Sequence, residues 1–252
     1  MELYPVKLKP VFKDYIWGGN TLKAKFNKQT NLERVAESWE LAVHKEGECK
    51  VQGGPHDGIP LSGLLKLWGT EVLGSNYNKA VKTFPLLIKF IDAKDNLSIQ
   101  VHPSDDYSLK VEGQPGKTEM WYIINAEEDA KIIYGFKDNI TKEEFLDAVK
   151  NNTLTDILNV IPVKKGEAYF IPSGTVHAIC KGSLIAEIQQ NSNVTYRIYD
   201  YDRIDKDGNK RPLHLDKAVD VINFNKADLT QNIDIKKYSP ERLLAHCKYF
   251  KV

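Results

Sequence analysis

Residues 166–177 read GEAYFIPSGTVH, a short run of β-favouring side chains enclosed by glycines and closed by a histidine. Gly166 and Gly174 permit tight turns around this run, because glycine adopts backbone conformations that other residues avoid. Pro172 lacks the N–H that would continue a strand ladder, so the strand is expected to end there. The pattern predicts a short strand followed by a sharp turn that directs His177 into the interior of a β-structure.

Gln100 and His102 stand two residues apart in the segment SIQVHP, residues 98–103. Side chains alternate between the two faces of a strand, so a strand here would project both residues from one face. Ile99 and Val101 would then face the opposite way. The segment therefore predicts two polar side chains directed together into the protein interior.

Glu119 follows His102 by 17 residues, a gap that fits a loop and a return along a neighbouring strand, and His177 would come from a third strand. With Gln100, these residues offer two imidazoles, one carboxylate and one amide oxygen, a set that suits zinc or a similar divalent ion. Such a zinc site keeps a formal charge of about +1 and remains a Lewis acid. Spacing alone leaves the alternative open, because a histidine on a strand is more often a hydrogen-bonded polar residue than a ligand.

Composition excludes several functional classes. The 35 Lys and Arg nearly balance the 34 Asp and Glu, so no overall field would recruit nucleic acid or an anionic membrane. No apolar run approaches the roughly 18 residues that span a bilayer. The cysteines, Cys49, Cys180 and Cys247, are odd in number, widely spaced and preceded by no signal peptide, which predicts a reduced, cytoplasmic setting.

The middle of the chain predicts a quick succession of short strands, which is typical of a β-barrel or a β-sandwich. The expected strands are 84–91, 98–102, 120–124, 131–135, 168–171, 183–189 and 195–199. Short helices are expected over 61–67 and 216–223.

A helical insertion near 141–158 is expected to interrupt the strands. Thr141 can cap a helix with Glu144 three residues later, and Phe145, Leu146 and Val149 would share one face. A second turn is expected over 154–158.

The GEAYFIPSGTVH stretch resembles the second cupin motif, G-x5-P-x-G-x2-H, at every fixed position through His177. The resemblance implies a mainly β protein with a cupin-type β-barrel, or jelly roll, and a few short helical insertions. Two departures stand out. Lys181 occupies the position of the usual asparagine, and Gln100 replaces the first histidine of the usual H-x-H in the first cupin motif.

Several further segments together are similar to type I mannose-6-phosphate isomerase in its short bacterial form. They are IQVHP (99–103), GKTEMWY (116–122), YRIYDYDR (196–203), YIWGG (15–19), ESWE (37–40), FPLLIKF (84–90) and RPLH (211–214). The resemblance covers roughly residues 1–225. It implies an isomerase domain over 1–240, whereas residues 241–252 resemble the opening strand of a small, truncated or minimal C-terminal β-domain.

The family resemblance implies that mannose 6-phosphate and fructose 6-phosphate are interconverted through a cis-enediol. It places one zinc ion on Gln100, His102, Glu119 and His177, and it makes Arg197 the catalytic arginine.

Five further residues are candidates for proton transfer or substrate binding. Glu187 is a candidate base, and Lys117 could tune that base or meet the phosphate. Ser98, Lys94 and Trp17 are candidate substrate-binding residues, although a lysine is more often a solvated charge and a tryptophan is as often part of the core.

Two rival functions remain at this stage. A non-catalytic sugar-binding or regulatory cupin would keep the β-fold and the metal without turnover. An iron-dependent oxygenase would use the same fold, although Gln100 departs from the usual histidine-rich iron site. The expected partner is a small sugar phosphate, with neither nucleic acid nor membrane, and the chain is expected to be a monomer or a homodimer.

Overall fold

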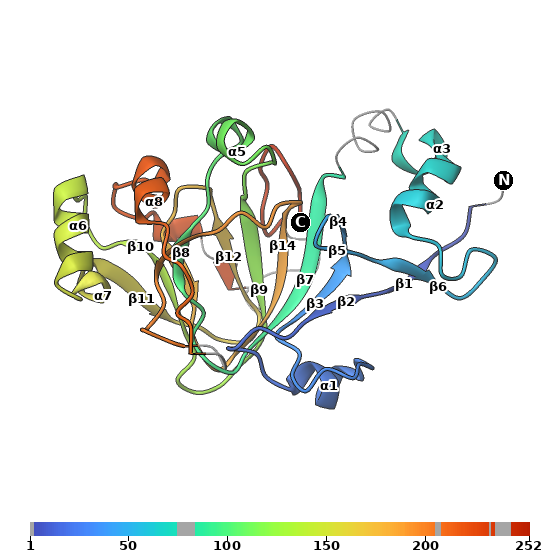
Figure 1. The fold of residues 1–252 in the computed structure, drawn as a ribbon, viewed down its shortest axis with the longest axis horizontal. Helices are drawn as coiled ribbons and strands as arrows, with labels where there is room; N and C mark the ends of the chain where they lie inside the picture. The colour runs from blue at the N-terminus through green and yellow to red at the C-terminus, as the bar shows by residue number, and fades with distance from the viewer. Residues whose placement is uncertain (1–2, 75–83, 205–207, 232, 235–242) are drawn as a thin grey trace.

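Two antiparallel β-sheets dominate the computed structural model, which describes residues 3–74, 84–204, 208–231, 233–234 and 243–252 (Figure 1). The larger sheet has seven strands in the order β16 (Ile233–Asp234), β12 (Glu167–Ile171), β9 (Glu119–Ala126), β14 (Ser183–Gln190), β7 (Leu86–Ala93), β3 (Glu37–Leu41) and β2 (Val11–Lys13). The smaller sheet has five strands in the order β11 (Leu158–Pro162), β10 (Lys131–Phe136), β13 (His177–Ile179), β8 (Ile99–Val101) and β15 (Tyr196–Tyr199).

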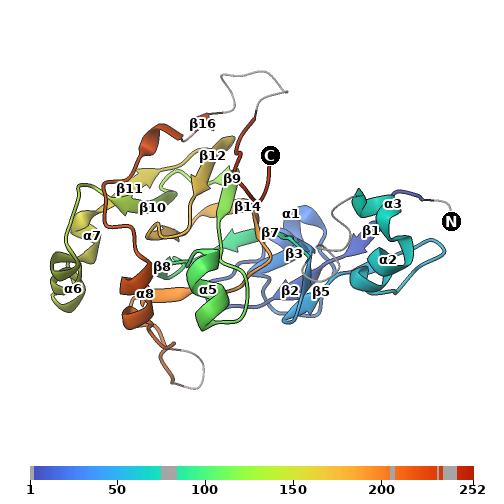
Figure 2. The same cartoon turned by 90° about the horizontal axis from the view of Figure 1, so that it is seen from above.

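Short helices and two small ribbons decorate the sheets. The ribbons pair β1 (Lys7–Lys9) with β6 (Lys50–Gln52), and β4 (Val43–His44) with β5 (Gly47–Glu48). The helices are α1 (Thr21–Phe26), α2 (Leu61–Trp68), α3 (Thr70–Leu73), α5 (Asp105–Val111), α6 (Lys142–Lys150), α7 (Leu154–Ile157), α8 (Leu215–Val221) and the 3-10 helix η2 (Leu229–Gln231). Helices α6 and α7 lie at one end of the molecule and α2 and α3 at the other (Figure 2). No helix within the described ranges is long and apolar enough to cross a membrane.

The main core lies between the two sheets. It combines Ile91, Trp121 and Ile185 of the larger sheet with Ile132 and Ile179 of the smaller one. The other face of the smaller sheet forms a second core with the helices, so this sheet is buried on both sides. That core includes Ile99 and Val101 of β8, Phe145 of α6 and Ala218 of α8. The prediction that Ile99 and Val101 face away from Gln100 is therefore confirmed.

The expected mainly β jelly roll is confirmed, but the strands do not close into one hydrogen-bonded barrel. The described strands form two separate sheets instead. This is the double-sheet form of the jelly roll, in which the core fills the space between the sheets.

The helical insertion forms with the predicted N-terminus. Thr141 Oγ1 accepts a hydrogen bond from the backbone of Glu144 at 3.1 Å, and the Glu144 carboxylate accepts one from the Thr141 N–H at 2.7 Å. The predicted apolar face is wrong at one position. Leu146 is exposed, and the buried face is formed by Phe145 and Ala148, which lie three residues apart.

One strand of the smaller sheet, β11, had no clear signal in the sequence, whereas a strand carrying His177 was expected. The expected turn over 154–158 is the single helical turn α7, and β11 follows it without a break. Strand β13 begins at His177 itself.

Residues 243–252 do not form a regular strand. A bridge between His246 and Lys251 closes a turn, and Ala245 and Phe250 pack against Met120. The division of the chain at residue 240 stays a prediction.

Gly174 provides a test of the turn before His177. Its φ is +88°, and an added Cβ would lie 3.0 Å from the Val221 carbonyl oxygen. Gly58 has a similar φ of +80° with nothing within 4 Å of an added Cβ. Gly58→Ala should lower the free energy of unfolding by about 1–2 kcal/mol through backbone strain alone. Gly174→Ala should lower it further by a steric contribution, measured by urea unfolding, and equal losses would contradict the packing role assigned to Gly174.

Candidate metal and substrate site

The five-stranded sheet places three polar residues in one cross-strand row. His177 on β13 pairs with Gln100 on β8, and Gln100 pairs with Arg197 on β15. Directly paired residues on antiparallel strands share a face, so all three side chains point toward the other sheet. Three segments that are distant in the sequence thus contribute to one surface.

The seven-stranded sheet supplies the opposite wall. Trp121 on β9 pairs with Glu187 on β14, and Glu187 pairs with Lys89 on β7. Glu119 lies two residues before Trp121 and shares its face.

The loop before β9 is fixed by hydrogen bonds. The Asp105 carboxylate accepts from the Gly116 N–H at 2.9 Å, and the Gln190 amide oxygen accepts from the Thr118 N–H at 2.9 Å. These contacts hold Lys117 between them.

Three of the four predicted metal ligands converge. Nε2 of His102 and Nε2 of His177 are 3.2 Å apart, and Glu119 carboxylate oxygens lie 3.6 Å from the first and 3.5 Å from the second. These potential ligand atoms all lie within 4.8 Å of one another, on side chains that are essentially excluded from solvent.

The protein backbone fixes both histidines in the tautomer that a metal requires. Nδ1 of His102 lies 2.8 Å from the Val194 carbonyl, and Nδ1 of His177 lies 2.8 Å from the Thr175 carbonyl. A carbonyl can only accept, so each Nδ1 carries the proton and each Nε2 presents a lone pair. Burial lowers the pKa of His177 to about 4 and that of His102 well below its usual value, so both rings are neutral at pH 7.

The Gln100 side chain also reaches this point, but with its amide nitrogen rather than the amide oxygen that would bind a metal. Its nitrogen lies 3.4 Å from Nε2 of His177, and its oxygen accepts a hydrogen bond from the Ser98 hydroxyl at 3.3 Å. A half-turn of the amide exchanges the two atoms and directs the oxygen toward the histidines. Gln100 is therefore adjacent to the three converging ligands, and its role as the fourth stays a prediction.

A series of buried side chains with alternating charge runs from Glu119 across the larger sheet to Glu37. Lys117 lies 2.5 Å from Glu119 and 3.4 Å from Glu187, and Lys89 lies 3.1 Å from Glu187 and 3.5 Å from Glu37. Burial would raise the pKa of Glu187, but Lys117 and Lys89 outweigh it and lower that pKa to about 2. Burial and the neighbouring charge of Glu187 raise the pKa of Glu119 to about 7.

The chemistry of these residues fits a divalent cation. Three carboxylates against two ammonium groups leave the buried chain with a formal charge of −1 when all are ionised. Glu119 Oε1 has no hydrogen-bond donor within the described part of the chain, and the Nε2 lone pair of His177 lies 3.5 Å from it. The Lys117 ammonium already lies 3.1 Å from Nε2 of His102, so this donor set attracts positive charge. His102, Glu119 and His177 would hold the ion, with Gln100 beside them.

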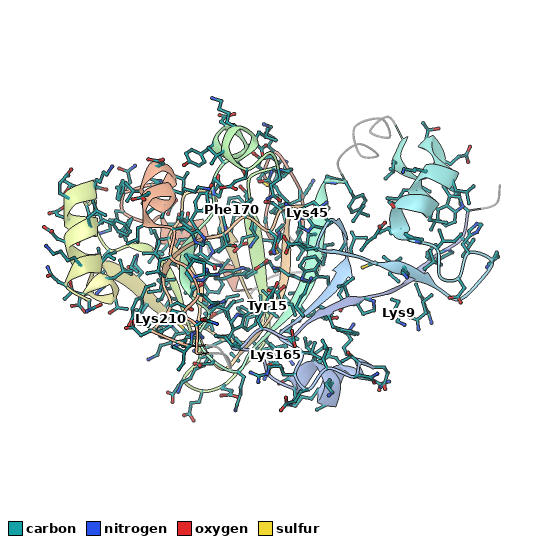
Figure 3. All side chains as sticks on the ribbon, in the orientation of Figure 1. Lys9, Tyr15, Lys45, Lys165, Phe170 and Lys210 are labelled. Carbon is teal, nitrogen blue, oxygen red and sulfur yellow. The ribbon has the colours of Figure 1, made fainter. Side chains whose placement is uncertain are left out.

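A cavity of about 220 Å³ opens beside these groups and receives most of the predicted site residues. It is lined by Trp17, Ser98, Gln100, Lys117, Glu187 and Arg197 from the predicted set, together with Tyr15, Glu37, Lys89, Ile91, Leu97, Ile179, Asn193, Thr195 and Arg211. Tyr15 lies near the centre of the molecule in Figure 3, whereas Lys9 and Lys210 lie toward its edges.

Lys94 is not brought to this cavity. Its side chain is exposed and lines a separate hollow beside Gly18, Gly19 and Asp92. Sequence reasoning also missed residues that do line the cavity, above all Lys89 and Glu37. One signal was available for Lys89, because a lysine in the otherwise apolar segment FPLLIKF is seldom buried without a charged partner.

Two facing sheets with a buried His–Glu–His donor set beside a charged cavity define a protein of the jelly-roll class with a candidate metal site. Residues 6–120 match the family model described as phosphomannose isomerase type I, catalytic domain. A probable mannose-6-phosphate isomerase of Bacillus subtilis is 40% identical over 99% of this chain and 78% of its own length. The chain therefore belongs to the type I phosphomannose isomerase family.

Solved structures agree with the fold. The crystal structure of the mannose 6-phosphate isomerase from Bacillus subtilis superposes with a TM-score of 0.85 at 38% identity, covering 98% of this chain and 78% of that one. A mannose 6-phosphate isomerase bound with zinc and yttrium shares the fold with a TM-score of 0.65 at 18% identity, covering 88% of this chain and 75% of that one.

The ligand assignment predicts the behaviour of His177→Ala. This variant should lose bound divalent metal, because removal of Nε2 leaves only His102 and Glu119 of the converging ligands. Metal content by plasma emission spectrometry on the folded protein is the measurement. His246→Ala, which removes an exposed histidine that is not part of the donor set, should keep its metal. Stoichiometric metal in His177→Ala would show that the ligand set is wrong.

Proposed function

We propose that this chain interconverts mannose 6-phosphate and fructose 6-phosphate through a cis-enediol intermediate, with one zinc ion on Gln100, His102, Glu119 and His177. The observation that carries the proposal is the convergence of the His–Glu–His donor set, an arginine and a lysine–carboxylate pair at one cavity. Aldose–ketose isomerisation needs a proton carrier and positively charged groups, because a proton moves between C1 and C2 while negative charge develops on the adjacent oxygens. When bound, the ion would supply Lewis acidity for those oxygens.

Arg197 is suited to stabilise charge that grows during the reaction. It lines the cavity on the strand next to Gln100, and Nη1 donates to the Pro212 carbonyl at 2.8 Å. Its buried Nε has no hydrogen-bond partner in the described part of the protein. Burial and the nearby Arg211 lower the pKa of Arg197, but a guanidinium with so high an ordinary pKa stays protonated. Because the Arg197 side chain lines the cavity, its guanidinium is placed to donate to a developing oxyanion there.

Glu187 and Lys117 form the proposed acid–base pair. One oxygen of Glu187 lies 3.4 Å from the Lys117 ammonium, and the other accepts from the Trp121 indole at 2.9 Å. Glu187 is ionised and lies against Lys117, so we assign the proton transfer to this pair, with Lys117 as the group that meets the sugar and Glu187 as the group that orients it.

The coupled assay of fructose 6-phosphate formation from mannose 6-phosphate tests the function directly. Turnover by the zinc-loaded protein is expected. Sugar-phosphate binding without turnover would favour the non-catalytic cupin, and oxygen consumption would favour the oxygenase. We further propose a reducing, cytoplasmic setting, supported by three free cysteines, and a monomer or homodimer.

The acid–base assignment predicts different effects on proton exchange. Lys117→Met should abolish the incorporation of solvent deuterium at C2 of mannose 6-phosphate, because the proton carrier is gone. Glu187→Gln should reduce this exchange and leave it measurable, because the lysine remains. Proton NMR of the sugar follows both variants, with metal content as the control. Exchange that survives in Lys117→Met and disappears in Glu187→Gln would make the carboxylate the base.

The role of Arg197 predicts a loss of kcat with retained metal. Arg197→Ala should lower kcat and kcat/KM together by on the order of 100-fold, as removal of one donor to an oxyanion does. Arg197→Lys should recover little, because an ammonium lacks the planar fork. Steady-state kinetics with metal analysis measure both effects, and Arg34→Ala, in the separate hollow, is the arginine control. Weaker binding with normal kcat would make Arg197 an anchor rather than a catalytic residue.

A further inference from the structure

We propose that Arg211 binds the phosphate group of the substrate at the end of the cavity remote from the metal ligands. This inference rests on the proposed function, since it takes the substrate to be a sugar phosphate. Arg211 lies in the RPLH segment outside the strands, and its guanidinium lines the cavity.

The guanidinium of Arg211 is held in place before any ligand arrives. Its Nε lies 2.8 Å from one oxygen of Asp200 and its Nη2 lies 2.5 Å from the other. Asp200 is buried and also accepts from Nη2 of Arg203 at 2.5 Å. The two-point contact fixes the plane of the Arg211 fork, while its Nη1 has no partner among the described residues. An arginine whose free donors are already oriented is a suitable binding group for a phosphate.

Charge distinguishes Arg211 from the lysines of the cavity. Lys89 and Lys117 each lie between two carboxylates, so their charges are largely neutralised. The two guanidinium groups that line the cavity here, those of Arg197 and Arg211, lie near the single buried carboxylate of Asp200, which leaves a formal charge of +1 at this end. A phosphate dianion is therefore attracted to the arginine end and repelled from Glu37 and Glu187.

The strand arrangement sets the order of the groups along the cavity. The RPLH segment runs beside β15, because the His214 N–H donates to the Arg197 carbonyl at 2.8 Å and the Arg197 N–H donates to the His214 ring at 3.1 Å. Gln100, Arg197 and this segment thus follow one another at strand-like spacings, roughly 10 Å in total. A six-carbon sugar with its reacting carbons at one end and its phosphate at the other matches this order.

Substrate kinetics of Arg211→Gln with the zinc-loaded protein test the proposal. Loss of a charge-assisted phosphate contact should raise KM for mannose 6-phosphate by about 10- to 100-fold with kcat largely kept. Arg203→Ala removes a similar contact to Asp200 but no residue that lines the cavity, so its effect on KM should be much smaller. Arg211→Lys, which can keep an ion pair with Asp200, should fall between the wild type and Arg211→Gln. Equal effects of Arg203→Ala and Arg211→Gln would assign the loss to Asp200 and overturn the proposal, as would an unchanged KM.

Binding of inorganic phosphate gives a readout that needs no turnover. Calorimetric titration of the zinc-loaded protein should show phosphate binding that weakens by a similar factor in Arg211→Gln and is kept in Arg203→Ala. If the wild type fails to isomerise mannose 6-phosphate but shows this pattern, the proposed function fails and the anion site stands. If the wild type turns over and Arg211→Gln binds phosphate normally, the isomerase stands and the anion site is wrong.

Discussion

The ion-paired chain of Glu37, Lys89, Glu187, Lys117 and Glu119 is the constraint around which the space between the sheets is organised. Moving single charges out of water costs several kcal/mol each, and they are tolerated here because every member touches an opposite charge. Removal of one member leaves its neighbour buried and unpaired, so the chain behaves as a unit. The five residues carry a formal charge of −1 when all are ionised, and the His102 and His177 lone pairs lie beside Glu119, where a divalent cation would more than offset that charge.

Sheet geometry makes this arrangement possible. Each wall carries one polar row, His177–Gln100–Arg197 on the smaller sheet and Trp121–Glu187–Lys89 on the larger, and apolar side chains such as Ile91, Ile123 and Ile179 lie around them. A slip of one residue in any strand would move its polar group to the opposite face. The helices on the far side of the smaller sheet bury Ile99 and Val101, and this burial fixes the register that turns Gln100 inward. The second core thus fixes the strand that positions Gln100.

The sequence predicted the parts of the site that depend on local spacing. The GEAYFIPSGTVH turn, the alternation around Gln100 and His102 and the Thr141 capping box each follow from rules that act within a few residues. The contribution of Glu37 and Arg211 depends on strand pairing and on loops that close over β15, and neither is encoded in a short segment. Lys94 was misleading because it lies one residue beyond β7, where the chain has turned toward the other hollow. Local pattern therefore predicted three residues that converge at one point, whereas tertiary pairing decides which cations reach the cavity.

The lysines and the arginines of the cavity differ in how completely neighbouring carboxylates neutralise their charges. At the metal end, each lysine is matched by two carboxylates, so a proton can move without leaving an isolated charge in the interior. At the other end, Asp200 is shared among arginines that it orients but cannot neutralise, and the excess charge remains for an anion. If the compensation were reversed, the phosphate would be drawn to the reacting end and would compete with the sugar oxygens for the cation. Under the proposed function, this polarity of the cavity would orient a phosphorylated sugar with its phosphate toward Arg211.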